Sequence, residues 1–413
     1  MYVERMARAM SAGGWDVTVL CATYPGAARE ERLGSVRFIR RGGRYSVYLR
    51  AAMHVLGRHT RYDAIVDIQN GLPFWTPLFT STPVVLLIHH VHREQWPVVF
   101  GPWRARLGWW LESRLAPAVY RGCRYVTVSQ ATRSELVGLG VDPAHVQVIY
   151  AGNDMPDEVD VRGSLGRHEP PSLVILGRLV PHKRVEIAID ALASLRERFP
   201  ALTLDVVGSG YWQDELRAHA GRLGVTDAVL FRGFVSEATK HRLLAQASVN
   251  LMPSLKEGWG LAVVEAAAHG TPSVAFRAAG GTAESVVHGR TGLLADDPAQ
   301  FTDHVATLLS DPHLRDEMGA AARMYAGQFT WRATGEQFRT VVESARAQAP
   351  TGTTTLPALA APARTLSARH SHDAAAASPL AAAESSSHRC ETRGEVVFGK
   401  NPGPVLGTDV PTE

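Results

Sequence analysis

The chain has 413 residues, of which 45% are hydrophobic and 20% charged, and these values are ordinary for a globular protein with two separate cores. Its formal net charge of +3 is too small to indicate a nucleic-acid partner. Cys21, Cys123 and Cys390 have neither the spacing of a zinc site nor the pattern of a disulfide framework, so we expect a reducing compartment such as the cytoplasm.

Helical patterns alternate with short apolar strands through the first 150 residues. The chain opens on an amphipathic helical pattern over residues 2–10, which Gly13 and Gly14 end. Near-continuous apolar strands separated by helices indicate a parallel sheet covered on both faces, so we expect a Rossmann-like domain over residues 1–156. The strands expected in this domain are residues 16–21, 63–67, 84–88, 125–128 and 146–149.

The start of the chain departs from this alternation. A Rossmann-like sheet normally begins with a strand and a Gly-rich turn, whereas here the helix over residues 2–10 comes first. We therefore expect the first strand of the N-terminal domain to be missing, with Met1 as a misassigned start.

The alternation restarts after a polar stretch and predicts a second Rossmann-like domain over residues 157–328. A last helical pattern begins at an aromatic segment and covers residues 329–348. Beyond it, low-complexity runs with few large apolar residues cannot bury a core, so residues 349–413 are predicted to be a disordered tail. The strands expected in the second domain are residues 173–176, 202–207, 229–231, 249–251 and 273–276.

Glu257 and Glu265, eight positions apart, mark the most informative segment. Gly258 and Gly260 permit a tight turn, and the apolar run over residues 261–268 predicts a buried helix in which Glu265 needs hydrogen-bonding partners. Amides at a helix start suit a phosphate, and two carboxylates suit the hydroxyl groups of a ribose and a sugar ring. Taken alone, a solvated Glu257 and a Glu265 bonded to a neighbouring strand is the simpler interpretation.

A second candidate site follows the first strand of the second domain, at Gly177, Arg178 and Lys183. Ligands of open parallel sheets bind beyond the carboxyl ends of strands, so Arg178 and Lys183 are placed to neutralise a diphosphate without a metal. Gly208 opens a Gly-rich turn after the next strand, and a plain strand-to-helix turn explains it equally well. The chain has no Asp-x-Asp motif, so we expect no metal and no cofactor.

Histidines follow the strand at residues 84–88. His89 stands at its carboxyl end, where it could bond a sugar hydroxyl or stabilise charge during bond breaking. Together with His90 and His92 it also forms a candidate metal site, but no Cys or carboxylate partner has the spacing of a zinc site. A structural role for His90 and His92 is the favoured interpretation.

Residues 103–124 carry five arginines and three tryptophans with a single glutamate. This composition fits contact with an anionic membrane surface, and it fits equally a surface helix whose aromatic residues pack inward. The apolar strands are far shorter than the roughly 20 residues of a membrane span, and no signal-sequence pattern opens the chain. We therefore expect a cytoplasmic protein, with peripheral contact at the inner membrane face left open.

These motifs, in this order, resemble the retaining glycosyltransferases of family 4 over about residues 1–348. The most specific part is Glu257, seven intervening residues and Glu265, followed by Ala-Ala-Ala-His-Gly-Thr-Pro. The resemblance implies the GT-B architecture, in which two Rossmann-like domains face each other across a cleft and the helix over residues 329–348 crosses back to the first domain. It also implies that Glu257 contacts the donor sugar and Glu265 the ribose.

The resemblance implies further residues around the donor. They are a phosphate-binding pair, two diphosphate-binding amides, a backbone contact to the base and an active-site histidine. The phosphate-binding pair is Arg178 and Lys183, and the two amides are those of Gly260 and Leu261. Val235 makes the backbone contact to the base, and His89 is the active-site histidine.

The implied reaction moves a hexose-type sugar from a nucleotide diphosphate to a hydroxyl of a glycan or lipid-linked acceptor, with retained configuration and without a metal. His89, Glu257, Arg178 and Lys183 would be the catalytic residues, acting mainly by positioning and electrostatic stabilisation. Two alternatives stay open: an inactive GT-B scaffold or binding protein, because of the missing strand, and a GT-B sugar-nucleotide epimerase.

Overall fold

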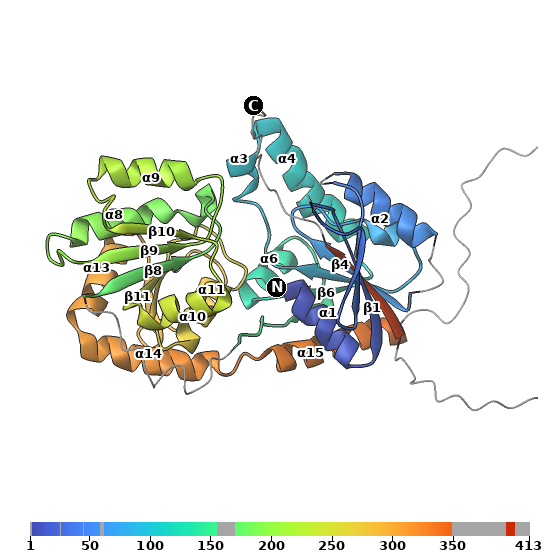
Figure 1. The fold of residues 1–413 in the computed structure, drawn as a ribbon. Helices are drawn as coiled ribbons and strands as arrows, with labels where there is room; N and C mark the ends of the chain where they lie inside the picture. Colours follow the sequence, from blue (N-terminus) through green and yellow to red (C-terminus); the bar gives the residue numbers. More distant parts are fainter. Residues whose placement is uncertain are drawn as a thin grey trace, which may run out of the picture.

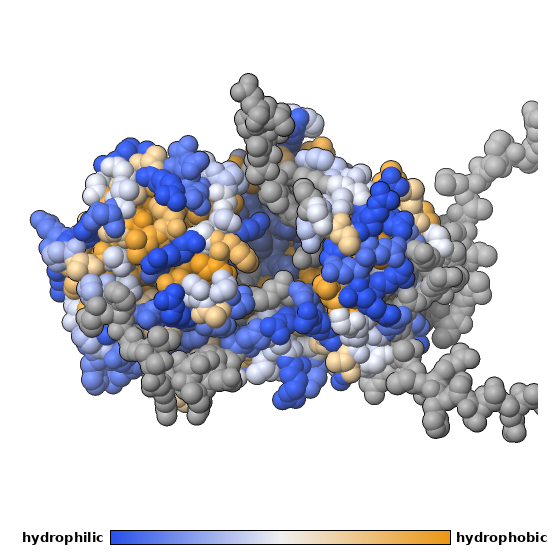
Figure 2. All heavy atoms as spheres, viewed as in Figure 1, coloured by the Kyte–Doolittle hydropathy of each residue, from blue (hydrophilic) through white to orange (hydrophobic). Residues whose placement is uncertain are grey.

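The structure, a computed structural model, describes residues 2–24, 26–43, 45–57, 62–154, 170–348 and 394–400. Figure 1 shows two α/β domains side by side, bridged along one edge by the consecutive helices α14 (Pro312–Ala326) and α15 (Trp331–Ala347). The surface is hollowed between the two domains (Figure 2).

The N-terminal domain is built on an eight-stranded sheet in which all neighbours are parallel except β2 and β3. In sheet order the strands are β2 (Glu30–Leu33), β3 (Val36–Arg40), β1 (Trp15–Cys21), β14 (Gly394–Lys400), β4 (Ala64–Gln69), β5 (Val84–Ile88), β6 (Arg124–Thr127) and β7 (Val146–Val148). The helices are α1 (Tyr2–Ala12), α2 (Ser46–Leu56), η1 (Thr76–Leu78), α3 (Trp96–Val99), α4 (Pro102–Trp110), the π-helical η2 (Leu111–Leu115), α5 (Ala116–Val119), α6 (Gln130–Gly138) and η3 (Pro143–His145).

Strand β14 occupies the centre of this sheet. No described strand precedes α1, and β14 lies between β1 and β4, parallel to both, with Val396 opposite Val17 and Phe398 opposite Val66. We expected residues 349–413 to form a disordered tail, but residues 394–400 are a strand; the rest of that segment lies outside the described residues. The physical reason is that β1 and β4 would otherwise leave unpaired backbone groups inside the domain, and a seven-residue segment of the tail pairs with them.

The C-terminal domain has a six-stranded, fully parallel sheet, as the alternation of strands and helices predicted. In sheet order the strands are β10 (Val229–Gly233), β9 (Thr203–Val207), β8 (Ser172–Leu176), β11 (Val249–Met252), β12 (Ser273–Phe276) and β13 (Gly292–Ala295). The helices are η4 (Pro181–Lys183), α8 (Val185–Leu195), α9 (Gln213–Arg222), α10 (Glu237–Gln246), α11 (Leu261–Ala268), α12 (Thr282–Ser285), α13 (Pro298–Ser310) and α14.

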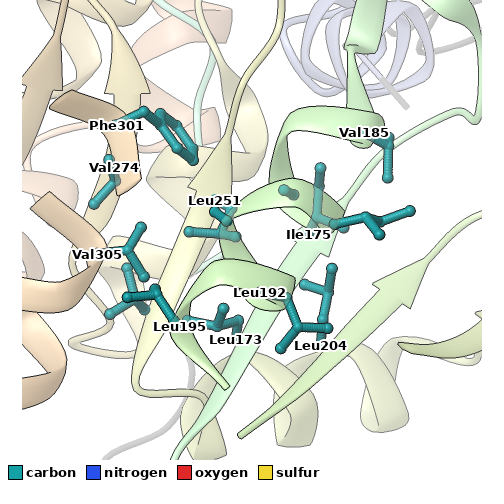
Figure 3. Packing of buried hydrophobic residues seen from close by; sticks show 14 of the residues in the cluster. Leu173, Ile175, Val185, Leu192, Leu195, Leu204, Leu251, Val274, Phe301 and Val305 are labelled. Atoms are coloured by element: carbon teal, nitrogen blue, oxygen red, sulfur yellow. The ribbon is translucent and has the colours of Figure 1, made fainter. Parts of the chain in front are cut away.

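The main core of the C-terminal domain lies between its sheet and helices α8 and α13. Leu173, Leu204 and Leu251 reach it from three neighbouring strands, and Leu192 and Phe301 reach it from the two helices (Figure 3). Burial of these side chains is the main stabilising term of the domain. The core therefore fixes β8, β9 and β11, whose carboxyl ends carry the residues discussed below.

Helix α15 packs on the N-terminal domain, although it follows the C-terminal domain in the sequence. Its apolar face contributes Phe338 and Val342 to the cluster that contains Met6 and Met10 of α1. The helices approach closely at Gly335, where a Cβ would lie 2.4 Å from the Cβ of Ala9. The chain thus crosses between the domains more than once, which ties their relative positions.

Candidate active site

The loop between β11 and α11 lies against the N-terminal domain. A Cβ at Gly258 would lie 2.3 Å from the carbonyl oxygen of His89, so only glycine fits this contact. Gly260 has a φ of +78°, a left-handed conformation that glycine adopts without strain, and it directly precedes Leu261, the first residue of α11. The end of β5 and the N-terminus of α11 therefore meet between the domains.

The structure brings Glu257 and Lys183 together in an ion pair. Lys183 ends the turn η4 after β8, whereas Glu257 precedes α11, so two separate sequence motifs meet at one point. Arg178 also follows β8; it is exposed, and its side chain forms no hydrogen bond or ion pair within the described part of the chain. Burial, with Lys183 and Arg178 nearby, lowers the pKa of His182 to about 4. The exposed Arg178 side chain is therefore available to bind an anion beside the Lys183–Glu257 pair.

Glu265 lies in the middle of α11 and is largely buried. Its carboxylate accepts a hydrogen bond from Lys240 of α10 at 2.8 Å, and the same ammonium bonds Glu237 at 2.7 Å. Burial raises the pKa of the Glu265 carboxyl, and the attraction of Lys240 opposes this shift. A buried carboxylate needs such a partner. The sequence did not reveal Lys240, because only the packing of α10 on α11 brings the two side chains together.

Gly177 and Gly208 pack directly on each other. Gly208 has a φ of +132°, and a Cβ there would lie 1.9 Å from the carbonyl oxygen of Gly177. This contact between neighbouring strand ends requires glycine at Gly208 whatever ligand binds. Val235 follows β10 and packs beside the buried side chains of α10, and the preceding Phe234 is exposed.

His89 lies at the interdomain contact made by the loop between β11 and α11, which carries Glu257 and is called the glutamate loop below. Its ring stands edge-on to the ring of Tyr2, with 5.0 Å between centroids, and its carbonyl oxygen accepts a hydrogen bond from Thr132. His90 and His92 are bonded within the N-terminal domain, to Gln95 and Glu112 respectively. In the part of the chain that the structure describes, no group of three or more His, Cys, Asp or Glu side chains could hold a metal ion.

Polar contacts hold the two domains together beside this site. The Glu284 carboxylate of α12 accepts hydrogen bonds from the backbone amides of Gln130 and Ala131, at 2.9 and 2.7 Å, at the N-terminus of α6. Lys256, next to Glu257, forms an ion pair with Glu135 of α6. The glutamate loop therefore lies between the two domains, and these polar contacts to α6 hold the domains together beside it.

Some side chains of residues 103–124 lie outward, as membrane contact would need, and others pack inward, as in an ordinary surface helix. Trp103 and Trp110 are 67% and 52% exposed, and Leu107 is also exposed. Trp109 is half-buried, and Glu112 is buried. Arg104 and Arg106 are exposed on the same helix. None of the described helices is long and apolar enough to cross a membrane.

Two protein-family models match the chain. The model described as Glycosyltransferase Family 4 matches residues 1–155, and the model described as Glycosyl transferases group 1 matches residues 158–325. The chain is 34% identical, over 238 residues, to a GDP-mannose-dependent alpha-(1-6)-phosphatidylinositol monomannoside mannosyltransferase of Mycolicibacterium smegmatis, covering 53% of this chain and 62% of that protein. It is 35% identical, over 236 residues, to a D-inositol 3-phosphate glycosyltransferase of Kribbella flavida, covering 52% of this chain and 55% of that protein. The chain spans about half the length of the curated relatives it matches.

Solved structures share the fold at low sequence identity. A sucrose-phosphate synthase from Thermosynechococcus elongatus superposes with a TM-score of 0.71 at 21% identity, covering 84% of this chain and 93% of that one. WaaG, a glycosyltransferase involved in lipopolysaccharide biosynthesis, superposes with a TM-score of 0.63 at 19% identity, covering 82% and 94%. With both halves matched in order and the architecture shared, this chain belongs to family 4 of the glycosyltransferases and has the GT-B fold.

Proposed function

We propose that the protein is a retaining glycosyltransferase that moves a hexose-type sugar from a nucleotide diphosphate to an acceptor hydroxyl, without a metal. The observation that carries the proposal is the meeting of Lys183 and Glu257 beside exposed Arg178 and the N-terminus of α11. Cations and helix-terminal amides suit a diphosphate, and a carboxylate suits a sugar hydroxyl. His89 lies across the interdomain contact from this group.

In the proposed reaction the bond between the anomeric carbon and the diphosphate oxygen breaks, and a bond to the acceptor oxygen forms on the same face. The proton of the acceptor hydroxyl goes to the leaving diphosphate. Arg178, Lys183 and the amides of Gly260 and Leu261 stabilise the charge that develops on that group. Glu257 holds Lys183 in place and bonds a hydroxyl of the donor sugar.

The other predicted donor contacts follow the same arrangement. Glu265, held by Lys240, bonds the ribose, and the backbone of Val235 meets the base. Gly177 and Gly208 keep the strand ends beside Arg178 free of side chains. None of these contacts involves a metal.

For the acceptor we propose a lipid-linked or glycan hydroxyl reached from the N-terminal domain. Relatives are named for phosphatidylinositol monomannoside and for D-inositol 3-phosphate, and these compounds are the first acceptors to test. Exposed Trp103, Leu107 and Trp110 alternate with Arg104 and Arg106 on α4, which fits peripheral contact with the anionic inner face of a membrane.

Donor binding and turnover test this proposal. Thermal shift with GDP-mannose and with uridine-diphosphate sugars identifies the donor, and release of the nucleoside diphosphate measures turnover. Glu265→Ala and Lys183→Ala are each expected to lower turnover at least about 100-fold, because each removes a buried or paired charge at the donor. Asp227→Ala removes a surface ion pair with Arg196 in the same domain and is the matched control.

Three outcomes would count against the proposal. Wild-type rates in both variants would remove the assigned site. Isomerised donor released without an acceptor would favour the epimerase, and absence of any donor binding would favour the scaffold.

A further inference from the structure

Glu112 is a buried carboxylate that the donor site does not use. It is 2% exposed and lies in the π-helical turn η2, where α4 continues into α5. One carboxylate oxygen accepts hydrogen bonds from the backbone amide of His92 at 3.2 Å and from its ring Nδ1 at 2.9 Å, and the other accepts from Trp96 Nε1 at 2.6 Å. Because a buried charge is costly unless fully bonded, this arrangement fixes the segment after β5. π-Helical turns are frequent at functional sites.

His92 is held on both sides of its ring. Its Nδ1 lies 2.9 Å from Oε1 of Glu112, and its Nε2 lies 3.0 Å from the side-chain amide of Asn70, the residue that follows β4. Trp96, the second partner of Glu112, packs on α4 so closely that a Cβ at Gly108 would lie 2.4 Å from its ring. The imidazole of His92 therefore has no freedom to turn.

His90 rests on this fixed ring. The centroids of His90 and His92 are 4.3 Å apart, and Nε2 of His90 lies 3.2 Å from Oε1 of Gln95. When Gln95 accepts the Nε2 proton, Nδ1 keeps a lone pair that can accept a hydrogen bond. Burial, with His92 beside it, keeps the pKa of His90 well below its usual range, so the ring stays neutral.

His90 directly follows His89, whose carbonyl oxygen meets Gly258 of the loop between β11 and α11. Gly258 directly follows Glu257, so this contact places His90 near the Lys183–Glu257 pair, and the charge of Lys183 contributes to the lowered pKa of His90. Lys183 is paired with Glu257, which we assign to the donor sugar. Because the donor contacts come from the C-terminal domain, a group of the N-terminal domain opposite them is placed for the acceptor.

We propose that Glu112 is a positioning residue, which through His92 and Trp96 holds His90 opposite the Lys183–Glu257 pair, and that Nδ1 of His90 accepts a hydrogen bond from a hydroxyl of the acceptor. The ligand class is a polyol, such as a sugar or cyclitol ring. This inference rests on the proposed transferase function and adds its acceptor contact. The sequence favoured a structural role for His90 and His92; the proposal keeps a supporting role for His92 and assigns His90 to the acceptor.

The test separates acceptor use from donor use. With the donor found by thermal shift, transfer to D-inositol 3-phosphate, to phosphatidylinositol monomannoside in vesicles and to methyl α-mannoside is measured beside donor hydrolysis by water. Glu112→Gln and His90→Ala are expected to raise the acceptor KM at least about tenfold and to change the donor KM less than about twofold, since one good hydrogen bond is worth about a factor of ten. His90→Asn keeps an acceptor oxygen near the position of Nδ1 and is expected to recover most of the loss, whereas His90→Gln is not.

Asp67→Asn is the matched control. Asp67 is another fully buried carboxylate of the same domain, bonded to Tyr120, Thr76 and the Phe74 amide, but it belongs to a separate network. This change is expected to lower the melting temperature without moving the acceptor KM.

The outcomes distinguish the two proposals. An unchanged acceptor KM in Glu112→Gln and His90→Ala, with donor hydrolysis intact, would overturn the inference and leave the proposed function standing. A wild-type protein that turns over no donor would remove the proposed function itself, and one that hydrolyses donor but glycosylates none of the three probes would count against a polyol acceptor. If Glu112→Gln fails to fold, the contrast between Asn and Gln at the half-buried His90 still decides the question.

Discussion

The two domains reach similar parallel sheets from differently ordered stretches of sequence. The six strands of the C-terminal sheet all come from residues 172–295, whereas the N-terminal sheet combines residues 15–148 with β14 from residues 394–400. In the C-terminal domain each strand pairs with strands of the same continuous segment. In the N-terminal domain β1 and β4 depend on a segment that follows every other element. Similar sheets in one chain can therefore differ in the segments on which their stability depends.

The largest effect is expected from the core of the C-terminal domain. Phe301 is fully buried and stacks on Phe276, with ring centroids 5.1 Å apart. Phe301→Ala leaves a cavity and is expected to cost about 3–5 kcal/mol. Denaturant unfolding followed by thermal shift with donor should show loss of both stability and donor binding. Leu223→Ala, at an exposed position of the same domain, is the control.

A proline in β14 should affect the other domain. Val397→Pro removes a backbone donor from the centre of the N-terminal sheet, where Val397 lies between Thr18 and Ile65, and should cost about 3 kcal/mol. Native-state hydrogen exchange should show lost protection in β1 and β4, with β8 and β11 unchanged. Val397→Ile keeps the amide and serves as the control. Equal protection in both variants would contradict the assigned pairing.

Acidification should weaken the C-terminal domain through His269. Burial, with His241 2.8 Å away, lowers the pKa of His269 to about 4 in the folded protein. The unfolded chain therefore binds the additional proton between about pH 6.5 and pH 4, so stability falls as the pH falls through this window, by up to about 3 kcal/mol. Urea unfolding at several pH values measures the slope. His269→Asn should flatten it, and the same change at exposed His313 should not.

The smallest effect concerns the surface of the N-terminal domain. Arg104→Gln and Arg106→Gln are each expected to weaken binding to anionic vesicles by about 1 kcal/mol, with less effect at high salt. Vesicle sedimentation at two salt concentrations measures this change. Arg290→Gln is the matched control, because Arg290 is an exposed arginine of the C-terminal domain. Equal binding by all three variants would remove α4 as the contact surface.

The sequence predicted the elements whose apolar pattern is local. The strands expected around residues 84–88 and 173–176 correspond closely to β5 and β8. Strands β2, β3 and β13 went unrecognised. Strand β2 reads Glu-Glu-Arg-Leu and lies at a sheet edge, and β13, Gly-Leu-Leu-Ala, has only two large apolar residues. Pairing with a neighbour, rather than their own pattern, makes these segments strands.

The residues of the candidate site also fall into those that a local sequence pattern reveals and those that it does not. Arg178, Lys183 and Glu257 could be found because they stand in turns after strands, a position that the sequence reveals. Lys240 and Glu112 could not, because each becomes significant only through a partner distant in the sequence, Glu265 for the first and His92 for the second. Nor did the pattern of residues 103–124 show which tryptophans lie outward.

The position of β14 also sets an order of events during synthesis. Residues 394–400 leave the ribosome after all strands of the C-terminal domain, so that domain can close its sheet while β1 and β4 still await their common neighbour. Until then the nascent N-terminal domain presents two unpaired strand edges, the kind of surface that invites pairing with other chains. In this protein the half made first would be the half completed last.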